Sequence, residues 1–99
     1  MKLLDRENNE VQNIDFGIVE VGTTKTVEYQ LLNDEGTFVD LIEIKLADVP
    51  EAKEVTLSRY QAELGKDNQA SFTLTWTPTL EIKKGLQLDV KVSYRRLWK

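Results

Sequence analysis

Apolar and polar residues alternate with a period of two along most of this chain, a pattern typical of half-buried β-strands. The alternation is clearest in residues 70–77, where apolar side chains share one face and hydroxyl side chains share the other: Ala70, Phe72, Leu74 and Trp76 against Ser71, Thr73, Thr75 and Thr77. Because threonine suits an exposed pleated surface, this segment predicts a strand with Trp76 in the core and a flat, uncharged row of hydroxyls on the other face.

Six other segments have a similar apolar pattern. They are residues 3–4, 14–20, 27–32, 42–46, 55–57 and 86–94. Turn residues separate them, and Pro78 ends one strand because proline cannot donate to a strand ladder. Residues 14–33 predict an opening hairpin that turns at 21–24, and residues 33–36 predict a second hairpin loop in which Gly36 takes a positive φ. Short strands at this spacing predict a sandwich or a barrel.

Signals for helix are brief. Asp48 is the predicted N-cap of one turn that has Pro50 near its start, and residues 59–64 predict another turn closed by Gly65. Lys83, Lys84 and Gly85 predict a turn that leads into the last strand.

The order of these features resembles the ASH-type (abnormal spindle/hydin-like) and major-sperm-protein-like branch of immunoglobulin-like domains. The matching motifs are Phe16-Gly17, Val21-Gly22, the strand that ends at Asn33, and Trp76-Thr77-Pro78, where the family more usually has Phe-x-Pro. The resemblance covers nearly the whole chain. It implies an all-β, immunoglobulin-like antiparallel β-sandwich of about seven strands. The length of 99 residues predicts a single domain over 1–99.

The chain contains neither cysteine nor histidine. Disulfides, thiol nucleophiles and a Ser-His-Asp triad are therefore excluded. We predict that the chain is not an enzyme and takes no cofactor or metal, with a metal-dependent hydrolase built only from carboxylates as the residual alternative. Asp34, Glu35 and Asp40 lie near one turn, but they lack the spacing of a calcium loop and are interpreted as solvated acids.

The net charge of −4 disfavours nucleic-acid binding, which requires clustered lysine and arginine. The basic exception is the C-terminal group Arg95, Arg96, Trp98 and Lys99, in which an aromatic residue with flanking cations is a candidate anchor for a partner. The alternative is that the last strand continues and Trp98 covers the edge of the sandwich.

These observations favour a non-enzymatic structural or protein-interaction module that binds a protein partner or self-assembles through its edge strands. Small free-standing sandwiches suggest a phage virion component of the capsid or tail. The alternatives are a carbohydrate-binding module with Tyr60, Trp98 and Phe38 as aromatic contacts, or an ASH-like cytoskeletal adaptor domain. The chain shows no signal peptide and no transmembrane run, so we expect a cytoplasmic or virion location and no membrane partner.

Overall fold

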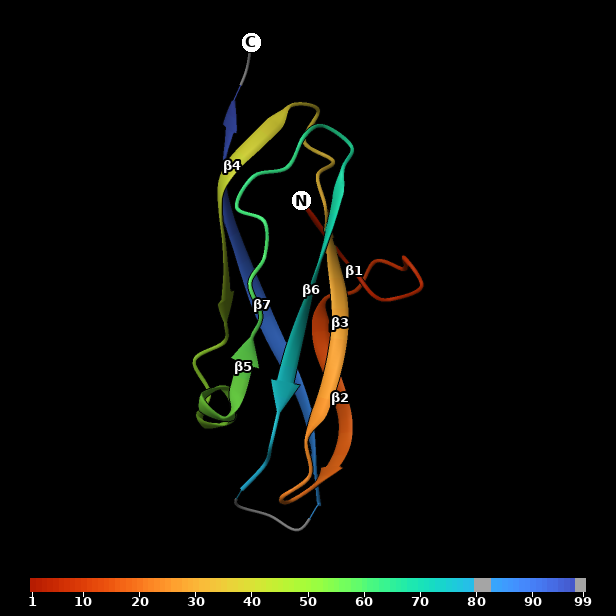
Figure 1. Ribbon diagram of the computed structural model, residues 1–99, viewed down its shortest axis with the longest axis vertical. Helices are drawn as coiled ribbons and strands as arrows, with labels where there is room; N and C mark the ends of the chain where they lie inside the picture. The colour runs from red at the N-terminus through yellow and green to blue at the C-terminus, as the bar shows by residue number, and fades with distance from the viewer. Residues whose placement is uncertain (80–82, 98–99) are drawn as a thin grey trace.

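The computed structural model describes residues 1–79 and 83–97. In these ranges it confirms the predicted all-β fold, with seven strands in two antiparallel sheets (Figure 1). All seven predicted strand segments are present. The strands are β1 (Lys2–Leu4), β2 (Asn13–Glu20), β3 (Lys25–Leu32), β4 (Phe38–Leu46), β5 (Val55–Leu57), β6 (Gln69–Trp76) and β7 (Lys83–Leu97).

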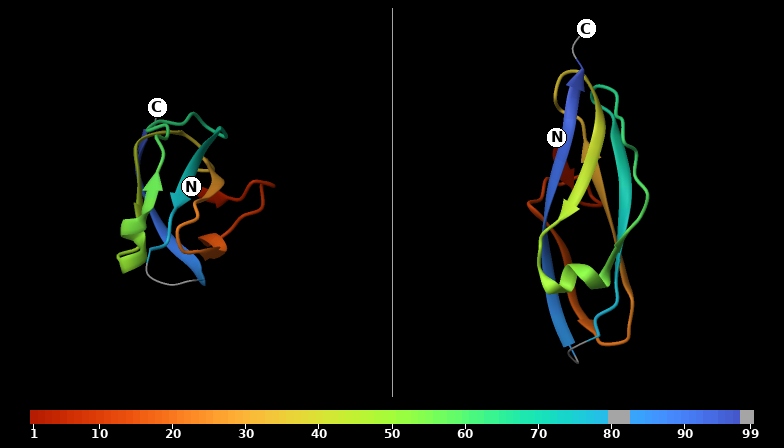
Figure 2. Two further views of the ribbon diagram at one scale, coloured as in Figure 1. Left: turned by 60° about the horizontal axis from the view of Figure 1, so that its bottom comes forward. Right: turned by 90° about the vertical axis from the view of Figure 1, so that its left-hand side faces the viewer.

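One sheet has the strand order β1-β3-β6-β5, and the other has the order β2-β7-β4. The two sheets face each other along an elongated body of 52 × 25 × 19 Å, as the side view in Figure 2 shows. β7 is the longest strand and runs nearly the full height of the molecule (Figure 1). It pairs with β2 through its first half and with β4 through its second half.

Apolar side chains of both sheets meet in the space between them. Trp76 is fully buried and its ring centroid lies 5.5 Å from that of Phe16 in the opposite sheet. The prediction that Trp76 belongs to the core is therefore confirmed. The Tyr29 hydroxyl also links the sheets, because it accepts the Asp15 N–H at 2.9 Å.

Both predicted hairpins are wrong. β2 and β3 lie in different sheets, so residues 21–24 carry the chain from one sheet to the other. Residues 33–36 likewise connect β3 to β4 across the sandwich, with Gly36 at a φ of +81° as expected. Alternation and turn residues locate two strands and the bend between them, but a hairpin and a crossing between sheets give the same local pattern.

Two of the predicted turns also differ. The helical turn is a 3₁₀ helix, η1 (Pro50–Glu54), whose N-cap is Val49 rather than Asp48 and makes no side-chain cap. Residues 59–64 form no helix. Instead Leu64 makes a bridge with Val39, with both N–H···O distances at 3.0 Å. This bridge satisfies backbone groups of Val39 that β7 does not bind, and a buried strand cannot leave such groups without partners.

The backbone of residues 83–85 forms no turn. These residues belong to β7, where Gly85 pairs with Ile18 of β2. The predicted strand start at residue 86 was therefore three residues late by sequence position. Glycine and adjacent lysines have low strand propensity, but pairing with β2 determines the backbone here.

Asn33 is the one polar side chain that is fully buried among the described residues. Its Nδ2 donates to the carbonyls of Thr37, Leu64 and Gly65 at 2.8, 3.0 and 3.0 Å. Its Oδ1 accepts the Glu35 N–H at 3.0 Å. One side chain thus joins the end of β3, the crossing to β4 and the segment before β6.

Substituting Asn33→Asp should lower the free energy of unfolding by about 2–4 kcal/mol, since the change replaces a buried donor with an oxygen that faces carbonyl oxygens. Urea unfolding followed by tryptophan fluorescence measures the loss. Asn68→Asp makes the same chemical change at an exposed position and should cost less than about 0.5 kcal/mol. Equal losses for the two variants would contradict the role assigned to Asn33.

Candidate interaction site

Two of the four residues in the predicted C-terminal anchor, Arg95 and Arg96, lie near the end of β7, while Trp98 and Lys99 lie outside the described residues. Arg95 forms a bidentate ion pair with Asp40, which lies directly opposite it on β4. Its Nε donates to Oδ1 at 2.9 Å and its Nη2 donates to Oδ2 at 2.6 Å. This pair lowers the pKa of Asp40 and raises the pKa of Arg95 above its usual value.

Glu35 is the centre of a second polar group at the same end of the sandwich. The Tyr94 hydroxyl donates to Glu35 Oε1 at 2.8 Å, and Arg96 Nη1 lies 3.8 Å from the same oxygen. The α-ammonium group of Met1 contacts Glu35 and lies 2.8 Å from Asp34 Oδ1. The hydrogen bonds from this ammonium, and then from Tyr94, lower the pKa of Glu35, while the bond to Glu35 raises the pKa of Tyr94.

The two described residues of the predicted anchor therefore have ion-pair partners within the chain. Arg95 and Arg96 remain about half exposed, with side-chain exposures of 58% and 53%, but both have acidic neighbours. Two of the acids predicted to be solvated, Asp40 and Glu35, are these neighbours, and the third, Asp34, pairs with the Met1 ammonium. Partner binding by Arg95, Arg96, Trp98 and Lys99 stays a prediction.

The aromatic candidates for carbohydrate binding have structural contacts. Tyr60 is half-buried, and its hydroxyl accepts the Ile44 N–H of β4 at 3.1 Å. Phe38 is also half-buried and pairs with Leu97 at the end of β4. Because the polar atom of Tyr60 already has a backbone partner, this residue is poorly suited to orient a sugar, and the carbohydrate-binding alternative gains no support from it.

The threonine row of β6 lies on the outer face of the four-stranded sheet. Thr75 contacts Thr26 of β3, with 3.2 Å between the two hydroxyls, and Thr77 contacts Thr24 at 2.8 Å. Cross-strand hydroxyl pairs of this kind stabilise a sheet. The row is an outward-facing, uncharged surface, as the sequence alternation predicted.

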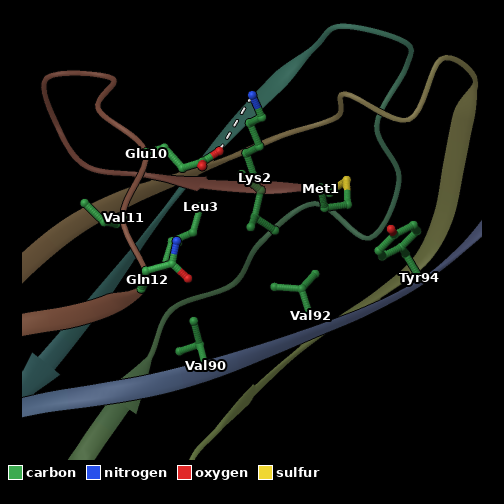
Figure 3. Close-up of a pocket in the computed structure, with 10 residues that line it drawn as sticks. Met1, Lys2, Leu3, Glu10, Val11, Gln12, Val90, Val92 and Tyr94 are labelled. Atoms are coloured by element: carbon green, nitrogen blue, oxygen red, sulfur yellow. Dashed lines mark ion pairs between the residues drawn. The ribbon is translucent and has the colours of Figure 1, made fainter.

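A cleft that sequence reasoning did not find lies between β1 and the second half of β7. It has a volume of about 380 Å³ and is open to solvent on one side. In Figure 3, Val90 and Val92 project from β7 toward Leu3 of β1, in the opposite sheet, and toward Met1. The sequence offers one signal for this cleft: the last alternating run is longer than the run at 14–20, so one strand cannot cover the edge of the other completely.

Comparison with known families gives one match. The model of the ASH family, described as abnormal spindle-like microcephaly-associated, ASPM-SPD-2-Hydin, matches residues 3–94. The chain belongs to the ASH family. No curated protein and no solved structure matches the chain. The resemblance to the ASH family proposed from the motifs is thus confirmed. The motif residues of this ASH domain have structural roles, because Phe16 and Trp76 pack against each other in the core and Gly22 lies in the crossing between the sheets with a φ of +82°.

The described part of this ASH domain contains no helix with the length and apolar character needed to cross a bilayer. Over the same residues, acidic side chains form no group of three or more that is arranged to hold a metal ion.

The acidic pairs at the upper end of the sandwich predict a dependence of stability on pH. Asp34, Glu35 and Asp40 have lowered pKa values in the folded chain. Their stabilisation is present above the ordinary carboxyl pKa of about 4 and is lost as the pH falls through the lower folded values. Thermal unfolding between neutral and strongly acidic pH should therefore show a stability loss that Glu35→Gln reduces.

Glu43→Gln is the matched control for this prediction, because Glu43 lies on β4 with a side chain that is 57% exposed. Its pH profile should follow that of the unaltered chain. If Glu35→Gln and Glu43→Gln gave the same profile, the Glu35 contacts would not be the cause of the acid sensitivity.

Proposed function

We propose that this ASH domain is a non-enzymatic module that binds another protein. The observation that carries the proposal is the family match over residues 3–94, since the resemblance to this family implies an interaction domain. The lack of histidine and cysteine supports it, because the chain has no thiol nucleophile and its serines have no histidine to act as their base.

The biological setting of this protein-binding module has two candidates, a cytoskeletal adaptor and a phage virion component. The family match is consistent with a cytoskeletal adaptor domain and gives no support to a phage capsid or tail component. Both settings stay predictions, as do the cytoplasmic or virion location and the absence of nucleic-acid and membrane partners. The genes that adjoin the coding sequence distinguish the two settings directly: capsid, portal or tail genes support the virion component, and microtubule or cilium genes support the adaptor.

The proposal is tested by affinity capture from the native source with the immobilised chain, followed by purification of the captured protein and titration against the domain. A saturable complex of defined stoichiometry is the expected result. Chain unfolded in urea provides a control, because a partner that recognises the folded surface should not bind it. If the chain instead captured only glycans, or turned over a substrate, the proposal would be wrong.

A further inference from the structure

Successive residues of β7 direct their backbone N–H and C=O groups to opposite edges of the strand. Ile44 of β4 lies opposite Val92 but donates its N–H to Tyr60 rather than to β7. In an antiparallel ladder the N–H and C=O of one residue point to the same edge, and successive residues alternate. The hydrogen bonds between β7 and β4 therefore belong to Lys91 and Ser93. The Ala47 N–H, which donates to the Asp89 carbonyl at 2.9 Å, fits this alternation.

The opposite edge of β7 is the one that binds β2. Asp15 donates its N–H to Tyr29, so the ladder bonds of this region belong to Ile14 and its partner Leu88. By the same alternation, the backbone groups of Val90, Val92 and Tyr94 point to the edge that Leu88 shares with β2.

β2 does not extend along these residues. Its pairing with β7 ends at Asn13 and Asp89, and two residues earlier Val11 already donates its N–H to Leu3 of β1 at 3.0 Å. Within residues 1–79 and 83–97, no strand pairs with Val90, Val92 or Tyr94 on this edge. An unpaired strand edge of this kind binds a further strand through its backbone groups.

Apolar side chains lie immediately beside the open edge. Val90 and Val92 are half-buried and line the cleft with Leu3, Val11 and Leu31. Polar side chains line it as well: Lys2, Glu10 and Gln12, with Lys2 and Glu10 3.6 Å apart in an ion pair (Figure 3). In a strand added here, the residues opposite Val90, Val92 and Tyr94 would exchange backbone N–H···O=C bonds with them. The side chains of the same residues would lie over this cleft. Apolar side chains are favoured at those positions because they would bury the exposed valine surface.

The intervening positions of an added strand would face outward, beside Lys91 and Ser93. Lys91 lies directly opposite Lys45 of β4 and lines one surface with Asp89, while Glu43 is 3.6 Å from Lys45, so the charges on this face balance. The residue of an added strand that pairs directly with Lys91 would lie beside a cation, so an acidic side chain is favoured there and a basic one is repelled.

We propose that the cleft between β1 and β7 binds an extended segment of a partner protein as an added antiparallel strand. The segment continues the line of β2 along Val90–Tyr94, with apolar residues facing the cleft and an acidic residue beside Lys91. This inference rests on the proposed protein-binding function and names the chemistry of the partner.

The probe is the synthetic peptide Thr-Val-Glu-Val-Glu-Val-Thr, capped at both ends, titrated into the full chain and followed by amide chemical shifts. Saturable shifts at Val90, Val92 and Tyr94 are expected. Methylating the peptide nitrogens of the three valines should abolish binding, because those N–H groups face β7, whereas methylating the two glutamate nitrogens should not. Replacing both glutamates with lysine should weaken binding about two- to tenfold at low salt.

Two protein variants locate the site. Val92→Lys places an ammonium group in the cleft, while Ser93→Lys places the same group on the outer face of the same strand. Thermal unfolding first establishes that both are folded. Loss of peptide binding in Val92→Lys alone supports the proposal. Equal binding to both variants, no binding by the unaltered chain, or shifts confined to other strands would overturn it.

Binding of the captured native partner to the two lysine variants distinguishes failure of this inference from failure of the proposed function. If the partner binds both lysine variants equally, the domain is a protein-binding module but the cleft is not its site. A concentration-dependent dimer that Val92→Lys converts to a monomer would overturn the proposed occupant, since the added strand would then come from a second copy of the chain.

Discussion

The structure depends on one strand that serves as the centre of a sheet whose other two strands never pair with each other. β7 binds β2 through Lys83–Asp89 and β4 through Val90–Leu97, on opposite edges. Backbone hydrogen-bonding groups alternate between the two edges of a strand. Each edge of β7 is therefore paired along only half of its length. The same feature therefore holds the three-stranded sheet together and leaves Val90, Val92 and Tyr94 facing a cleft.

Polar contacts fix one end of this arrangement. Asn33 binds three carbonyls and one N–H where β3 crosses to β4. Near the same end, Asp40 holds Arg95 across the β4–β7 ladder and Glu35 holds Tyr94. These contacts orient the upper half of β7 from the β4 side and from its inner face. They also explain why the basic residues at the end of β7 are less available to a partner than their position in the sequence suggests.

Local pattern was sufficient to locate the strands, the inward face of Trp76 and the positive φ of Gly36. Pairing was not predictable in the same way. The alternation in residues 14–33 is the same for a hairpin as for a crossing between sheets, and the Arg95–Asp40 pair joins residues 55 positions apart. The Val39–Leu64 bridge arises because β7 leaves the Val39 backbone without a partner, which follows only from the register of the whole sheet. The open edge of β7 was missed for the same reason.

Amide hydrogen exchange of β7 in the free chain is the most direct test of this account. Alternate protection is predicted: the amides of Lys91 and Ser93, which bind β4, should exchange slowly, and the amides of Val90, Val92 and Tyr94, which face the open edge, should exchange rapidly. Uniformly slow exchange along Val90–Tyr94 would show that both edges are already paired and would contradict the account.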